Sequence, residues 1–218
     1  MQQGHDLVTN RYGWTPVNAA ADSGHLEVIK FLVEKGADIT VANNDGWTPV
    51  NSAANSGHVE VVKFLVEKGA DARVANDAGL TPILTAAENG HLEIVKELEA
   101  VPGSDPTATD HLGRSSLFLS ARSGQAHVVQ HLLSNERVDP LIVDWCGSTP
   151  LFAAVANGHF HVVELLIAHH TSSLTRSYFD RSLIWWARRG GNLDVAQLLL
   201  RHANQPSNSV DSDIPCDG

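Results

Sequence analysis

One pattern recurs along this chain about every 33 residues, and its period limits the folds open to the chain more than any single residue does. Each copy is marked by a glycine, and successive marker glycines lie 33, 33, 34, 34 and 33 residues apart. A Thr-Pro pair, or a substitute for it, lies nine residues before each marker. Such a period is typical of stacked-repeat solenoids, in which each unit contacts only its neighbours. The markers are Gly24-His25, Gly57-His58, Gly90-His91, Gly124-Gln125, Gly158-His159 and Gly191-Asn192.

The copy at residues 43–75 shows how one unit is expected to fold. It begins with turn residues, after which Thr48 is a good N-cap and Pro49 suits the first position of a short helix. Gly57 is expected to end that helix, because the left-handed conformation is least strained as glycine. Residues 59–68 carry apolar side chains at helical spacing, which predicts a second, amphipathic helix. Since short helices are marginal alone, the first helix must bury its alanines against neighbouring units.

The residues that carry this pattern resemble the ankyrin-repeat family. Its signature runs G-x-T-P-(L/V), then A-A, then G-H-x-x-V-V-x-x-L, then G-A-D. In the second unit it is carried by Gly46-Trp47-Thr48-Pro49-Val50, Ala53-Ala54, Gly57-His58, Val61-Val62, Leu65 and Gly69-Ala70-Asp71. The resemblance covers residues 10–203 and implies an all-α solenoid of about six helix-turn-helix units with hairpin-like loops.

The resemblance also divides the chain into units. Residues 1–9 are expected to be the end of a preceding repeat, and residues 204–218 a disordered polar tail. Between them the repeats are expected at residues 10–42, 43–75, 76–109, 110–143, 144–176 and, as a terminal repeat, 177–203.

The later units depart from the family pattern. The histidine that often follows Thr-Pro-Leu is replaced in every unit, which puts the family's usual histidine-mediated bonding between neighbouring hairpins in doubt. Glu97 and Glu99 stand where other units have Phe31 or Val33, so the second helix of unit three is expected to pack less well. The ending Val138-Asp139-Pro140 resembles ankyrin arrays of filamentous fungi. The replacements for histidine are Asn18, Asn51, Leu84, Phe118, Phe152 and Trp185.

Composition and charge argue against several classes of protein. The sequence has no apolar stretch of 18 or more residues and no apolar segment near its start, so neither a membrane span nor a signal peptide is expected. The two cysteines, Cys146 and Cys216, lie far apart, which favours a reducing setting in the cytoplasm or the nucleus. The net charge of -10 weighs against nucleic acid, and the excess acid in residues 1–102 predicts a partner with a basic segment.

The sequence offers no arrangement for catalysis. His25, His58, His91 and His159 recur at one repeat position, which indicates a structural role at the turn. A zinc site would require three or four convergent ligands. Neither a phosphate-binding loop nor a nucleophile elbow is present. We therefore expect no enzymatic activity, no cofactor and no metal.

Trp14 and Trp47 occupy equivalent places near the hairpin tips, and two interpretations stay open. In the first they pack on each other and on Tyr12 and protect the stack. In the second they form a stripe that contacts a partner, because aromatic side chains are favoured in interfaces. A narrower hypothesis combines these aromatics with Asp22 and Asp45 into a cage for methyl-lysine or another cationic peptide side chain.

The function implied by the resemblance is that of a non-catalytic scaffold, which binds a partner protein through the concave face of the array. Hairpin tips and first helices line that face, and variable residues there select the partner. In unit six, Trp185 is expected in the core, while Trp186 and Arg188-Arg189 face the groove. The candidates for partner binding are Arg11, Tyr12, Trp14, Asp22, Asn44, Asp45, Trp47, Asn55, Asp77, Leu80, Glu88, Arg114, Trp145, Arg181 and Arg189.

A second function from a different class stays open. The array could be the sensor or spacer part of a larger fungal signalling protein, because unit one lacks a polar cap and residues 4–6 resemble the close of a preceding unit. Whichever function holds, the chain is expected to be a monomer or to pack end to end through its uncapped first unit.

Overall fold

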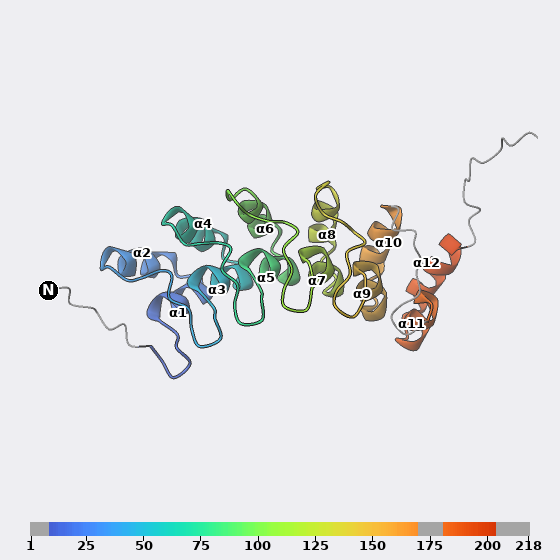
Figure 1. Ribbon diagram of the computed structural model, residues 1–218, viewed down its shortest axis with the longest axis horizontal. Coiled ribbons are helices and arrows are strands. Elements are labelled where there is room, and N and C mark those ends of the chain that lie inside the picture. Colours follow the sequence, from blue (N-terminus) through green and yellow to red (C-terminus); the bar gives the residue numbers. More distant parts are fainter. Residues whose placement is uncertain (1–8, 170–180, 204–218) are drawn as a thin grey trace, which may run out of the picture.

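The computed structural model describes residues 9–169 and 181–203, so most of the expected segment 1–9 and the whole expected tail 204–218 lie outside the described residues. The described residues form twelve helices in successive pairs, with one pair in each predicted unit. The first helices of the pairs form one row and the second helices another, and the hairpin loops project beyond the first row (Figure 1). The expected all-α solenoid is confirmed. The helices are α1 (Pro16–Asp22), α2 (Leu26–Glu34), α3 (Pro49–Ser56), α4 (Val59–Glu67), α5 (Pro82–Asn89), α6 (Leu92–Glu99), α7 (Ser116–Arg122), α8 (Ala126–Leu133), α9 (Pro150–Asn157), α10 (Phe160–Ala168), α11 (Leu183–Arg189) and α12 (Leu193–Ala203).

The first helix of each unit begins as the sequence predicts. Thr48 lies in extended conformation before α3, its hydroxyl accepts a hydrogen bond from the amide of Asn51 at 3.4 Å, and Pro49 is the first helical residue. Equivalent caps precede α1, α7, α9 and α11. Helix α5 is the exception, since the hydroxyl of Thr81 has no hydrogen-bond partner among the described residues.

The turn between the two helices locks each unit to the next. Gly57 ends α3 with φ +82°, and a Cβ placed there would lie 2.6 Å from the ring of His91 in the following unit. The Nε2 atom of that ring lies 3.0 Å from the carbonyl oxygen of Asn55, one of the last residues of α3. Glycine is required for both the backbone conformation and the close approach. The expected structural role of the marker histidines is confirmed for His58, His91 and His159. Gln125 forms the same bond through its amide, and Asn192 donates to the carbonyl oxygen of Val155, one residue earlier in its helix.

The core runs along the whole solenoid between the two rows of helices. The alanine pairs of the first helices are buried, as the sequence predicts, and each second helix contributes one apolar face. In unit two these are Ala53 and Ala54 on α3, and Val61, Val62 and Leu65 on α4. Because every such layer lies against the next, the units cannot be separated without exposing apolar surface.

Hydrogen bonds also join neighbouring hairpins. The expected loss of histidine-mediated bonding is offset in units one and two, whereas the side chains of Leu84, Phe118 and Phe152 cannot donate. The side-chain amide of Asn51 donates to the carbonyl oxygen of Leu80 in the next hairpin at 3.0 Å, and Asn18 donates to Trp47 in the same way at 2.8 Å. Asparagine thus replaces histidine as the donor in units one and two, because its amide reaches the same carbonyl. Main-chain hydrogen bonds add to this connection in units two to five. In each of these units one hairpin amide donates to a carbonyl oxygen of the preceding hairpin, and the donors are Asn44, Asp77, His111 and Trp145.

The two glutamates of α6 form polar contacts with neighbouring helices, in line with the expected weaker packing of this helix. Glu97 does not enter the apolar core but forms an ion pair with Lys63 of α4 at 3.2 Å. Glu99 lies 2.6 Å from the Nε2 atom of His131 on α8. Polar contacts therefore replace apolar ones on both sides of α6, and a groove opens between α4 and α6.

Unit two offers a matched test of the turn. Gly57 and Gly69 both have positive φ, but nothing lies within 4 Å of a Cβ at Gly69, whereas His91 blocks a Cβ at Gly57. We expect Gly69→Ala to lower the free energy of unfolding by about 1–2 kcal/mol, the usual strain of a left-handed alanine. Gly57→Ala should cost roughly 1 kcal/mol more, because His91 must move and lose its hydrogen bond. Urea unfolding measures the stability of both variants. Equal losses of stability would contradict the role of the contact between Gly57 and His91.

Candidate interaction surface

A single Asn or Asp side chain closes each hairpin that the structure describes, in units one to five. In unit two the Oδ1 atom of Asn43 accepts hydrogen bonds from the amides of Asp45 at 3.0 Å and of Trp47 at 2.9 Å. Asn43 also donates its own amide to the carbonyl oxygen of Trp47 at 2.9 Å. The two residues after the closing residue are therefore held at the tip. Asn10, Asn76, Asp110 and Asp144 close the other described hairpins in the same way.

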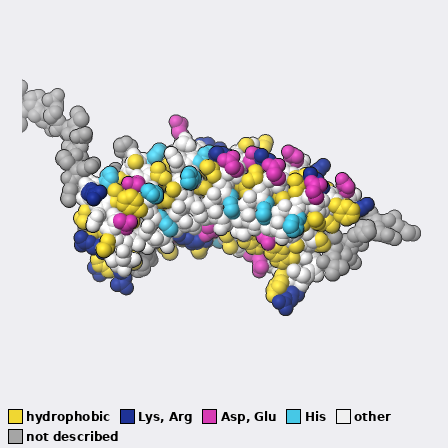
Figure 2. Space-filling view, turned by 180° about the vertical axis from the view of Figure 1, so that it is seen from behind, with side chains coloured by type: hydrophobic (Ala, Val, Ile, Leu, Met, Phe, Trp, Pro, Cys, Tyr) yellow, Lys and Arg dark blue, Asp and Glu magenta, His cyan; other side chains and the backbone are white. Residues whose placement is uncertain are grey.

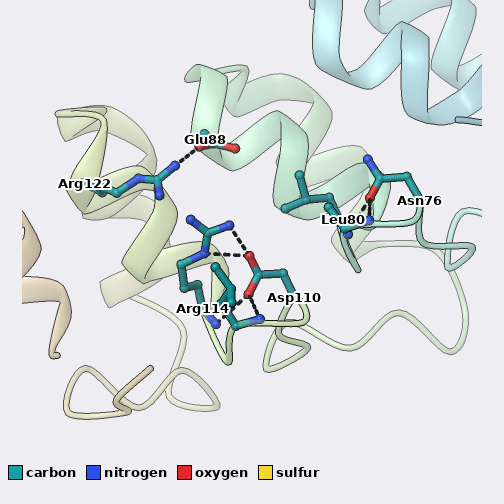
Figure 3. Close-up of polar contacts among 8 residues, drawn as sticks. Asn76, Leu80, Glu88, Asp110, Arg114 and Arg122 are labelled. Carbon is teal, nitrogen blue, oxygen red and sulfur yellow. Dashed lines mark hydrogen bonds and ion pairs between the residues drawn. The ribbon is translucent and has the colours of Figure 1, made fainter. Parts of the chain in front are cut away.

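The hairpin of unit four contains a buried ion pair. The side chain of Asp110 is fully buried, and the side chain of Arg114, only 16% exposed, lies 2.5 Å from it (Figure 3). Burial alone would raise the pKa of the Asp110 carboxyl. Hydrogen bonds from the Arg114 guanidinium and from the amides of Arg114 and Leu112 outweigh burial, so the pKa lies below its usual value. Arg114, expected to contact a partner, instead stabilises its own hairpin.

The hairpin tips carry the most exposed of the expected residues. Tyr12 is 52% exposed and Trp145 is 76% exposed. The guanidinium of Arg11 lies 4.6 Å from the centre of the Tyr12 ring, in a cation–π contact. Asn44, Asp45 and Asp77 are also exposed at the tips of their hairpins. These residues meet solvent on a backbone that the closing hydrogen bonds hold rigid.

Trp14, Trp47 and Leu80 lie at the base of successive hairpins and are half-buried. The expectation that Trp14 and Trp47 pack on each other and on Tyr12 is not met, since the aromatic pairs found among the described residues involve other rings. Each indole lies in its own unit, and the repeat separates equivalent positions by a whole helix pair. All three side chains are partly exposed at equivalent positions of successive units, and the second interpretation, a stripe that contacts a partner, stays a prediction.

The ends of the first helices are bonded to one another. The carboxylate of Asp22 accepts a hydrogen bond from Ser56 at 2.9 Å, and Asn89 donates to Asn55 at 3.1 Å. Glu88 forms an ion pair with Arg122 (Figure 3). Asp22, Asn55 and Glu88 were expected to contact a partner, but their side chains also connect consecutive units. The sequence signal for these pairs was a polar residue and its complement 34 residues apart.

Unit six carries a cluster of aromatic and arginine side chains. The guanidinium carbons of Arg181 and Arg189 lie 5.1 and 5.4 Å from the centre of the Trp185 ring. The ring of Trp186 packs edge-on against Trp185 at 5.0 Å and against Phe152 of α9 at 5.5 Å. The expectation that Trp185 lies in the core is wrong. Its ring is half-buried, and the guanidinium groups of Arg181 and Arg189 lie against it.

Charge is unevenly distributed over this surface. The excess of acidic residues lies in units one to three, where Asp45 and Asp77 are exposed. Arg11 lies at the tip of unit one, but most of the other arginines lie in units four to six, and the ion pair between Glu88 and Arg122 stands at the boundary. A partner that follows the row of hairpins from unit two onward would therefore meet acid first and base later.

One shallow pocket on unit one bears on the cage hypothesis. It holds about 240 Å³ and brings Tyr12, Trp14 and Asp22 together. Trp47 and Asp45, the other two residues of the hypothesis, do not line it. Two aromatic side chains and one carboxylate can attract a cation.

The described residues contain no group of three or more His, Cys, Asp or Glu side chains placed to hold a metal ion. Within them, no helix has the length and apolar character needed to cross a membrane.

Comparison with known families agrees with the repeats seen in the structure. A family described as ankyrin repeats (three copies) matches residues 1–76, 38–110, 83–177 and 117–212, which together span nearly the whole chain. A comparison with curated proteins gave no match.

The Asp110–Arg114 pair generates a pH-dependent prediction. Asp110→Asn keeps the hairpin closure that asparagine provides in units one to three, but it removes the charge. We expect a loss of about 1–2 kcal/mol in the free energy of unfolding at pH 7. The pair's contribution is present above pH about 4, the usual carboxyl pKa, and fades as the pH falls through the lower pKa of the folded state.

Thermal unfolding of both proteins between pH 7 and pH 2 measures the effect. The difference between them should shrink steadily below pH about 4, as the carboxyl takes up its proton. A difference that stays constant over this range would show that the charge on Asp110 contributes nothing.

Proposed function

The chain belongs to the ankyrin-repeat family, whose arrays generally serve as protein–protein interaction modules, and we propose that it is a non-catalytic scaffold. It binds one partner protein along its row of hairpin tips and the adjoining ends of the first helices. The observation that carries this proposal is the contrast between a fixed backbone and exposed tips. Tyr12 and Trp145 are largely solvent-exposed, although the amides of their hairpins are hydrogen-bonded to the closing residues Asn10 and Asp144 and to the neighbouring hairpin.

This contrast suits recognition for a thermodynamic reason. Ordering a flexible loop on binding consumes part of the binding free energy, and a hairpin that is already closed avoids that cost. Exposed tyrosine and tryptophan add large contact areas with few rotatable bonds, and such residues dominate binding energies in many interfaces. The half-buried Trp47 lies beside the tips and provides a semi-rigid apolar surface.

The charge pattern supports a partner with a basic segment. Asp45 and Asp77 are exposed on neighbouring hairpins, and their charges are free to attract lysine or arginine of the partner. The arginines of units four to six favour an acidic or aromatic continuation of the same partner. The association rate should therefore fall as salt is added.

A second candidate function rests on the pocket of unit one. Tyr12, Trp14 and Asp22 line it together, which favours a reader of methyl-lysine or of another cationic peptide side chain. Matched peptides that differ only in lysine methylation test this candidate. A reader prefers the methylated peptide at least tenfold and loses that preference in Trp14→Ala.

The cellular setting is part of the proposal as well. Cys146 is an exposed free thiol, which supports a reducing compartment, and we place the protein in the cytoplasm with the nucleus as the alternative. The same surface would serve a sensor or spacer within a larger fungal signalling protein, as the resemblance in the later units implies.

The main proposal predicts different effects for two aromatic substitutions. A partner is first isolated from native extract with the full chain as bait, and its affinity is measured by titration calorimetry. Trp47→Ala should weaken binding at least tenfold, as expected for an aromatic hot spot. Its free energy of unfolding should fall by about 2–3 kcal/mol, because truncation of the half-buried indole removes roughly 100 Å² of buried apolar surface.

Phe31→Ala is the matched control, since Phe31 is 57% exposed but lies on α2, in the outer row of helices. It should leave the affinity unchanged. The proposal fails if Trp47→Ala lowers only the melting temperature, or if the two variants weaken binding equally.

A further inference from the structure

The outer side of the solenoid contains a groove that the inner surface does not involve. It lies between α4 and α6 and has a volume of about 480 Å³, within the range of ordinary ligand pockets. Its walls come from the last two turns of α4 and from the end of α6 with the loop that follows. The lining residues are Val62, Lys63, Val66, Glu67, Glu97, Leu98, Ala100, Val101 and Pro102.

One substitution between units explains why the groove is open. Glu97 on α6 holds the repeat position that Phe64 holds on α4 and Phe31 on α2. Phe64 is half-buried and packs against the core. Glu97 instead reaches the ammonium group of Lys63 on the preceding second helix at 3.2 Å. By repeat symmetry, an aromatic ring at this position lies against the preceding second helix, so the groove is the space that a phenylalanine fills one unit earlier.

The groove has an apolar floor and a charged rim. Val62 and Leu98 form the buried part, and Val66 and Val101 are half-buried above them. The Lys63–Glu97 pair crosses the groove, and Lys63 also lies 3.8 Å from Glu60. Glu67 is exposed on the rim and takes part in none of the ion pairs found among the described residues.

Charge decides which occupant fits. Helices α2, α4 and α6 contain seven glutamates and three lysines, and Lys35 and Lys68 directly follow α2 and α4, so acidic charges still outnumber basic ones. Acidic side chains gather along the edge formed by the second helices, with basic ones among them (Figure 2). A second copy of this face would bring like charges together. Residues 204–218 of this chain carry three aspartates and no basic residue, so they are repelled as well. A positively charged segment of another protein is complementary.

We propose that this groove is a second binding site, which takes an aromatic side chain flanked by lysine or arginine from a partner protein. The ring enters the space that Phe64 fills in the previous unit and contacts Val62, Val66 and Leu98. The flanking cation lies beside Glu67 and the carboxylate of Glu97. The site is on the outer row of helices and so is independent of the hairpin tips.

The comparison of equivalent repeat positions also suggests a variant that blocks the groove. Glu97→Phe restores the side chain of units one and two and closes the groove from within. Because it fills a cavity, we expect it to raise the melting temperature by about 2–4 °C. The matched control is Glu93→Phe, which adds the same ring at an exposed position of α6 that does not line the groove.

The probe is a displayed library of random twelve-residue peptides, selected on the full chain and counter-selected on Glu97→Phe. We expect enriched peptides that carry an aromatic residue beside lysine or arginine. They should bind the original chain at least tenfold more tightly than Glu97→Phe, bind Glu93→Phe as well as the original chain, and weaken with Glu67→Gln. Trp47→Ala should leave their affinity unchanged, which separates this site from the inner surface.

Three results would overturn the proposal. The selection could yield no peptide that distinguishes the original chain from Glu97→Phe, the distinguishing peptides could lack the basic residue, or Glu93→Phe could block them equally. If Glu97→Phe does not fold, Ala100→Trp closes the groove from its exposed edge, and the same comparison is then made with that variant.

Discussion

The whole structure depends on the contact that each unit makes with the next at the turn between its two helices. A left-handed glycine leaves room for a ring or amide of the following unit, and that group bonds to a carbonyl at the end of the first helix, as between Gly57, His91 and Asn55. The contact sets the separation of consecutive units. At that separation the alanine faces of the first helices meet, and the main chains of neighbouring hairpins come within hydrogen-bond distance. A repeat with a bulkier residue at the turn would lose all three together.

This arrangement divides the polar side chains into two groups. Some hold units together, such as Asp22 with Ser56, and others hold one hairpin closed, such as Asp110 with Arg114. The remaining side chains at the tips, including Tyr12 and Asp45, take part in neither kind of contact and are exposed. The tip residues can therefore change without loss of stability. We regard this separation between stabilising and exposed side chains as the physical basis of the proposed scaffold function.

Much of this fold could be predicted from the sequence, because the repeat presents the same signals several times. Thr48-Pro49 as a helix start and Gly57 as a helix end are local features, and the structure confirms both. The site was harder, because it depends on distances between units. Arg114 and Glu88 appeared free for a partner, yet each meets an opposite charge that only the folded hairpin or the stacked helices bring close. The groove beside Glu97 likewise follows from the distance between α4 and α6, which no single unit encodes.

Hydrogen exchange of the full chain, alone and with the isolated partner, tests the central claim most directly. The account predicts that the partner slows exchange in the hairpins and at the ends of the first helices, around Trp47 and Asp77, and that the turns at the marker glycines are already protected in the free chain. Protection confined to the second helices, or marker turns that exchange as fast as unfolded peptide, would contradict it.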